Sequence, residues 1–273
     1  MEIRNILVGL DIDALSSDLV TFACHLAQSN QASVTGFAAA EPMPIAIGMD
    51  GGSAATVVYN EQRAEIEQAL AAAEAQFRKL IPSDLSHSWW SGEQDPSMGL
   101  VDIACRADLI VLGSPSQGHV NRSRQIDPDD VLLRAGRPVV IAAQGATQLD
   151  ANKILIAWKN TKEARRTVID ALAFLKAAEH VKVVSVREGD YPRERDSMME
   201  VVEWLQTHGV KAEGEVFPGR ARLAESIVEA AVDFGAGMIV SGAYGHSRFR
   251  EWLLGGVTRE LLGASFISRF MCG

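Results

Sequence analysis

The stretch Gly237-Met-Ile-Val-Ser-Gly-Ala-Tyr-Gly-His-Ser-Arg-Phe-Arg-Glu-Trp-Leu-Leu-Gly-Gly-Val-Thr258 runs from a short apolar segment through a glycine-rich loop. The apolar segment 238–240 predicts a buried strand, and Thr258 lies where a helix is expected to begin. Glycine lets the backbone approach a ligand closely, and a helix N-terminus presents unpaired N–H groups. These features are typical of a phosphate site, but a tight strand-to-helix connection needs the same glycines. The residues alone leave both interpretations open.

The apolar segment has a counterpart earlier in the chain, which indicates a repeat. Ala107-Asp-Leu-Ile-Val-Leu-Gly113 matches Ala236-Gly-Met-Ile-Val-Ser-Gly242. Asn5-Ile-Leu-Val-Gly-Leu-Asp11 likewise matches Lys153-Ile-Leu-Ile-Ala-Trp-Lys159. Two copies of one unit are therefore predicted.

Each copy alternates short apolar runs with segments of helical periodicity, a pattern that predicts a parallel sheet covered by helices. We expect an α/β protein with two tandem open parallel-sheet domains, helices on both faces, spanning residues 1–147 and 151–273. Strands are expected near 4–10, 33–39, 86–90, 108–113, 138–142, 153–158, 181–187, 210–217, 237–241 and 265–271. Helices are expected near 14–29, 58–80, 96–106, 129–136, 162–178, 192–208, 220–234 and 256–263.

Composition and charge argue against a nucleic-acid-binding protein, a membrane protein and a secreted disulfide-rich protein. The net charge of −9 argues against binding to nucleic acid. No apolar run is long enough to cross a membrane, no secretory signal precedes the first strand, and the three cysteines are scattered. We therefore expect a cytoplasmic protein. Residues 1–150 carry 9 Lys and Arg against 19 Asp and Glu, whereas residues 151–273 carry 17 against 16, so the second half suits an anion better.

The glycine spacing resembles that of the universal stress protein family. Gly242 and Gly245, then nine residues and Gly255, are similar to the family's ATP-binding pattern, and 5–11 is similar to its first strand. The resemblance covers both halves and implies a tandem member that binds a nucleotide, ATP with or without Mg²⁺. Arg137-Pro-Val-Val-Ile141 in the first domain also resembles the family's last strand, which commonly forms a dimer edge.

The resemblance also implies the residues of the site, all in the second domain. The glycines and Thr258 would hold the phosphates, and Val186 would line the base pocket. The full expected set is Lys159, Val186, Gly242, Gly245, His246, Arg248, Gly255, Gly256, Val257 and Thr258.

Both domains depart from the family pattern. Gly256 stands where a Ser or Thr is usual, and Lys159 replaces an acid that would accept hydrogen bonds. The first domain keeps the acid as Asp11 but lacks the glycine spacing. Asp127, Asp129 and Asp130 near the start of its last helix would repel phosphate. We expect the first domain to be structural.

The expected function is a stress-response regulator or sensor that binds ATP or a related nucleotide. No catalytic or metal site is predicted, because no nucleophile is paired with a base and no Cys or His spacing suits a metal. Two alternatives stay open. One is a protein-interaction module that binds no nucleotide, and the other is an enzyme of the nucleotide-alpha-hydrolase type, with at most slow ATP hydrolysis. A homodimer, or self-association through the terminal strands, is also expected.

Overall fold

The computed structural model describes residues 2–43, 52–115, 121–187, 191–218, 223–243, 256–263 and 266–273. Its strands and helices alternate along the chain, as the apolar runs predict. The first half consists of β1 (Asn5–Gly9), α1 (Ser17–Asn30), β2 (Ser33–Ala40), α2 (Gly52–Leu80), β3 (His87–Glu93), α3 (Pro96–Ile103), η1 (Ala104–Arg106), β4 (Leu109–Gly113), α4 (Pro128–Arg134) and β5 (Val139–Ala142).

The second half repeats this alternation, with two consecutive helices after its first strand. It consists of β6 (Lys153–Ala157), α5 (Lys162–Asp170), α6 (Leu172–Ala177), β7 (His180–Arg187), α7 (Tyr191–Thr207), β8 (Ala212–Pro218), α8 (Leu223–Phe234), β9 (Met238–Gly242), α9 (Gly256–Gly263) and β10 (Ser268–Cys272). The single helix expected over 162–178 is thus divided in two at Ala171.

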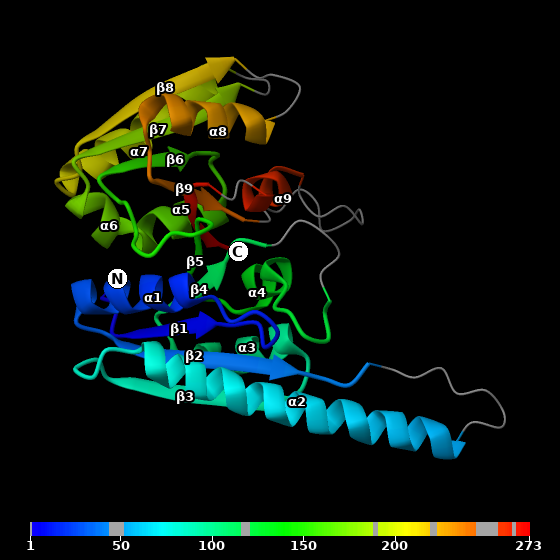
Figure 1. Cartoon of the computed structure of the whole chain (residues 1–273). Helices are drawn as coiled ribbons and strands as arrows, with labels where there is room; N and C mark the ends of the chain where they lie inside the picture. Colours follow the sequence, from blue (N-terminus) through cyan, green and yellow to red (C-terminus); the bar gives the residue numbers. More distant parts are fainter. Residues whose placement is uncertain are drawn as a thin grey trace.

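All ten strands belong to one sheet, in the order β3-β2-β1-β4-β5-β10-β9-β6-β7-β8 (Figure 1). Each half contributes five strands, and within each half neighbouring strands run parallel. The predicted α/β class with a parallel sheet is confirmed. The two halves meet at β5 and β10, which pair antiparallel, so the expected open sheets are joined into one.

The pairing of β5 with β10 uses the edges through which self-association was expected. Val140 lies opposite Phe270, and Ile141 lies opposite Arg269. The last strands of the two halves thus pair within one chain as the edge strands of two subunits would pair in a symmetric dimer. A homodimer formed through these same edges would first have to separate the two halves.

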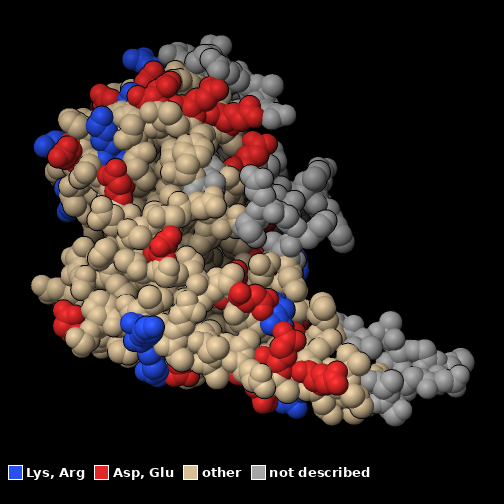
Figure 2. Space-filling view, viewed as in Figure 1, with Lys and Arg blue, Asp and Glu red and all other residues tan. Residues whose placement is uncertain are grey.

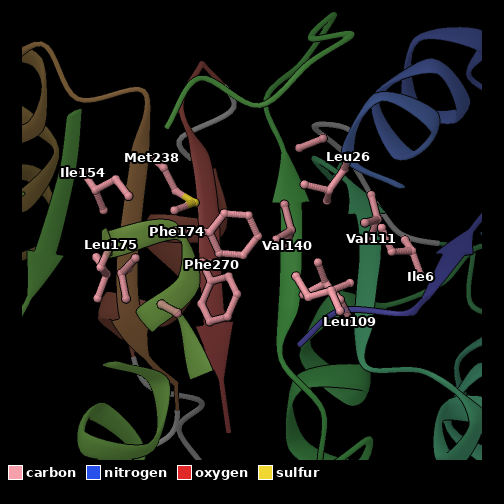
Figure 3. Close-up of a cluster of buried hydrophobic side chains, with 14 of the residues drawn as sticks. Ile6, Leu26, Leu109, Val111, Val140, Ile154, Phe174, Leu175, Met238 and Phe270 are labelled. Atoms are coloured by element: carbon pink, nitrogen blue, oxygen red, sulfur yellow. The ribbon is translucent and has the colours of Figure 1, made fainter. Parts of the chain in front are cut away.

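Apolar side chains from both halves fill the same layer on one face of the sheet. Phe174 of α6 contacts Phe270 of β10 with the ring centroids 5.7 Å apart. Figure 3 shows this pair between Met238 of β9 and Val140 of β5. All four side chains are buried in a cluster that reaches Ile6 of β1. Because burial of each such side chain stabilises by roughly 1.5–3 kcal/mol, this layer holds the halves together.

The polar residues of β10 lie inside the sheet. β10 is the strand of the second half that pairs with the first half. Arg269 is completely buried and donates to the carbonyl of Ile267 (2.7 Å), the carbonyl of Leu262 (3.1 Å) and Ser114 Oγ (3.1 Å). Burial lowers the pKa of Arg269 to about 10, which leaves it charged at neutral pH. These hydrogen bonds connect β10 both to the end of α9 and to the first half.

Candidate functional site

Each half has a point where the strand order reverses, and this is where ligands bind in open α/β sheets. In the first half β1 lies beside β4, and the chain continues from these strands in opposite directions across the sheet. In the second half β6 lies beside β9 in the same relation. The carboxyl ends of these strands are therefore the two candidate positions.

A pocket of about 410 Å³ lies at the carboxyl ends of β1 and β4. We call it the first-half pocket. Its walls come from both strand ends, the start of α1 and the segment before α4. It is lined by Gly9, Leu10, Asp11, Ala14, Ser16, Asp18, Leu19, Leu112, Gly113, Ser114, Pro115, Gln125, Ile126, Pro128, Ala142, Ala143, Gln144, Gly145 and Ala146. Another hollow, of about 690 Å³, is at the opposite edge of the sheet, near the starts of β1 and β2.

The first-half pocket is acidic. Asp11 and Asp18 are its charged lining residues, and Asp11 Oδ1 accepts a hydrogen bond from the Ile126 N–H at 3.2 Å. Burial raises the pKa of Asp11, and the nearby charge of Asp13 raises it further, while the Ile126 hydrogen bond opposes the shift. An anion placed here would meet two carboxylates, and none of the described lining residues is a cation.

The arginines near this pocket are already paired with acids. Arg124 contacts Asp13 at 2.6 Å and Glu65 at 3.3 Å, and its hydrogen bond to Asp13 is the main reason its pKa is raised. Arg122 contacts Asp127 at 3.0 Å. Figure 2 shows acidic and basic side chains lying together on this lower part of the molecule. The arrangement suits a half that binds no phosphate, which stays a prediction.

The corresponding position in the second half carries Lys159 and Gly242. Ala157 of β6 lies opposite Ser241 of β9. Gly242 directly follows Ser241, and Lys159 is two residues beyond Ala157, so Lys159 and Gly242 lie at the ends of neighbouring strands. Lys159 is exposed. Gly242 packs against the start of α5, where an added Cβ would lie 2.6 Å from the Ala164 nitrogen. Close packing against α5 therefore requires glycine at this strand end.

Half-buried apolar side chains line the carboxyl ends of the neighbouring strands. Val186, the residue expected in a base pocket, lies on β7 opposite Phe217 of β8. Both pack with Ala157 and Leu223 against the cluster beneath α8 and α9. Trp158 is buried on its strand end and donates from Nε1 to Ser197 Oγ at 3.1 Å, so it packs inward. The three strand ends thus present a continuous apolar surface, with Lys159 beyond it.

The rest of the expected set lies at or before α9. Gly256, Val257 and Thr258 are the first three residues of that helix, and their side chains are outside the described part. Gly245, His246, Arg248 and Gly255 are outside the described residues. The structure therefore brings together Lys159, Val186, Gly242 and the helix start at the same edge of the sheet.

Sequence reasoning missed Ser241, the residue before Gly242. It is only 5% exposed, and its Oγ has no hydrogen-bond partner within the described chain. The available signal was that Ser241 directly follows the apolar run Met238 to Val240, where the matching strand of the first half continues with Leu112.

The described residues offer no other chemical centre. They contain no group of His, Cys, Asp and Glu that could hold a metal. Burial raises the pKa of Cys24 to about 11 and that of Cys272 to about 12, so neither is a ready thiolate. No helix within the described ranges is long and apolar enough to cross a membrane.

Comparison with known proteins gives the family and the fold. A sequence model of the Universal stress protein family matches residues 2–143. None of the curated proteins matches this chain. A solved universal stress protein from Archaeoglobus fulgidus is 14% identical, with a TM-score of 0.68 over 98% of this chain and 97% of that chain. A functionally unknown protein from Pseudomonas aeruginosa is 18% identical, with a TM-score of 0.62 over 99% of this chain and 92% of that chain.

These two structures have the same fold as this chain over nearly its whole length. Because their sequence identity is low, the comparison shows a shared fold and nothing about a shared ligand or activity. A universal stress protein solved in complex with cAMP is a weaker match. It is 21% identical, with a TM-score of 0.34 over 54% of this chain and 100% of that chain, and it says nothing about the ligand here.

Proposed function

Because this chain belongs to the universal stress protein family, we propose that it binds a nucleotide, ATP, at the carboxyl ends of β6 and β9. The observation that carries this proposal is the adjacency of β6 and β9, which places Lys159 and Gly242 together at the reversal of strand order. The family match itself lies in the first half, and the second half has the same strand order.

Charge favours the second half over the first. The first-half pocket carries Asp11 and Asp18, which would repel a triphosphate. The second-half strand end carries Lys159, and α9 begins at Gly256 with backbone N–H groups that suit an anion. Lys159 would attract the phosphates, and the apolar surface at Val186 and Phe217 would pack against the base. The two domains, 1–147 and 151–273, would then have separate roles.

The cellular role that fits is a stress-response regulator or sensor in the cytoplasm, without a dedicated catalytic step. Self-association would have to use a surface other than the paired edges of β5 and β10.

A second candidate is a protein-interaction module that binds no nucleotide. It is favoured by the exposed apolar side chains Val57, Val58 and Tyr59 on α2, which extends beyond the end of the sheet (Figure 1). Under this alternative, substituting Gly245 with valine leaves the function intact.

Titration calorimetry with ATP and Mg²⁺ on protein freed of ligand tests the proposal. We expect binding, and we expect Lys159→Ala to weaken it roughly 2- to 10-fold, the range for loss of one hydrogen-bonded contact. Lys176→Ala is the matched control, because Lys176 is an exposed lysine on α6, and it should leave affinity unchanged. Absence of binding at millimolar ATP would refute the proposal.

A further inference from the structure

Ser241 is a buried hydroxyl without a partner at the edge of the proposed site. It is 5% exposed and its Oγ makes no hydrogen bond with any described residue. Buried hydroxyls are normally paired, because an unpaired one loses its bonds to water without replacement. One explanation for an unpaired buried hydroxyl is that it forms its hydrogen bond with an atom of a bound ligand.

The face on which Ser241 lies follows from the alternation along β9. Ile239 belongs to the cluster beneath α8 and α9, whereas Val240 belongs to the cluster on the opposite face. Because side chains alternate along a strand, Ser241 shares the face of Ile239. Its neighbour Ala157 packs on the same cluster, which puts Ser241 on the side that carries Val186.

The first half shows that this position faces a pocket. Val8 lies opposite Val111, so Gly9 and Leu112 are neighbours, as Ala157 and Ser241 are in the second half. Gly9 and Leu112 both line the first-half pocket. Ser241 therefore places a hydroxyl where the first half has an apolar branched side chain.

The surroundings of Ser241 favour an uncharged part of the ligand. Ala157 lies beside Ser241 on β6, and Val186 and Phe217 lie opposite each other on β7 and β8, nearer the carboxyl ends of those strands. These three half-buried side chains pack on the same cluster and form an apolar surface. A flat ring can pack on this surface. A phosphate buried beside Ser241 would lose its hydration, whereas the exposed Lys159 lies where phosphate can stay partly solvated.

We propose that the Ser241 hydroxyl hydrogen-bonds the base of the bound nucleotide, while the phosphates lie toward Lys159 and α9. This inference rests on the proposed function and adds a specificity-determining residue to it. The hydroxyl can donate or accept, so it can pair with a ring nitrogen or an exocyclic group. Because the bond would be made to the base, its contribution would be the same whatever the number of phosphates.

The test compares Ser241→Ala with wild type by calorimetry, using ATP, AMP and inorganic tripolyphosphate as ligands. We expect Ser241→Ala to weaken ATP and AMP by the same factor, roughly 3- to 10-fold, and to leave tripolyphosphate unchanged. Lys159→Ala should instead weaken ATP more than AMP. Ser185→Ala is the matched control: Ser185 is equally buried, at 5%, but lies on the opposite face of β7, between residues of the other cluster.

The outcomes separate this inference from the proposed function. If wild type binds ATP and Ser241→Ala binds it equally well, the role of Ser241 is wrong and the nucleotide site stands. If Ser241→Ala loses affinity for ATP and tripolyphosphate but not for AMP, the hydroxyl binds phosphate and the inference is also wrong. If wild type binds no nucleotide, both fall. The variant should fold, because removal of an unpartnered hydroxyl is expected to leave its melting temperature equal to or above that of wild type.

Discussion

Replacing Arg269 with methionine tests how the two halves are joined. Arg269 lies on β10 opposite Ile141, and its guanidinium bonds the carbonyls of Ile267 and Leu262 and the hydroxyl of Ser114. Methionine keeps much of the apolar stem but removes all three donors. The change therefore leaves the end of α9 and the tip of β4 without their shared partner.

The magnitude follows from two opposing effects. Hydrogen bonds from a charged donor contribute about 1.5–3 kcal/mol each, so three of them contribute roughly 4–9 kcal/mol. Burial of the charge opposes this, because the pKa of Arg269 is lowered to about 10 and a displacement of that size corresponds to about 3 kcal/mol. Apolar burial of the methionine offsets a further part. We expect a net loss of about 2–4 kcal/mol, or roughly 5–10 °C in melting temperature.

Thermal unfolding followed by circular dichroism measures this loss. Arg137→Met is the matched control, because Arg137 also donates to two carbonyls, those of Ala104 and Cys105, but is only half-buried and near solvent. It should cost less than about 1 kcal/mol. An Arg269→Met variant as stable as wild type, as found for some buried charges replaced by apolar residues, would refute the reasoning.

Three further predictions concern single sites. Gly242→Ala should lose about 1–3 kcal/mol in the free energy of unfolding, because the added Cβ would lie 2.6 Å from a backbone nitrogen of α5. Gly263→Ala is the control in the same urea titration and should be neutral, because an added Cβ there has nothing within 4 Å. Asp11→Asn should raise the melting temperature at pH 7 and leave it unchanged below about pH 4. The raised pKa of Asp11 makes its charged form unfavourable in the folded state, and this penalty is absent when both states are protonated. Of the three thiols, the exposed Cys105 should react rapidly with Ellman's reagent at pH 8 and the two buried ones only on unfolding; fast reaction of all three in the native protein would contradict the burial described.

Local pattern predicts most of this fold. The apolar runs near 4–10 and 153–158 become the central strands β1 and β6, because strands buried on both faces need continuous apolar sequence. The helix expected at 256–263 has the bounds of α9. The start of α2 at Gly52, earlier than expected, lies in a segment without an apolar face to reveal it.

Features that depend on contacts between residues far apart in the sequence could not be predicted from local pattern. Ser268 and Arg269 interrupt the apolar sequence of β10, and both are buried where β10 pairs with β5 of the other half. Their partners come from residues more than a hundred positions away, such as Ser114 and Ala143. Ser241 is a similar case, since nothing in a local pattern shows that a buried hydroxyl lacks a partner.

Photolabelling with 8-azido-ATP, followed by mass spectrometry of the peptides, tests the location of the nucleotide site most directly. We expect label, competed by ATP, on second-half peptides that contain Lys159, Val186 or α9. Labelling of peptides that line the first-half pocket, around Asp11 and Asp18, would contradict it, as would labelling that excess ATP does not prevent.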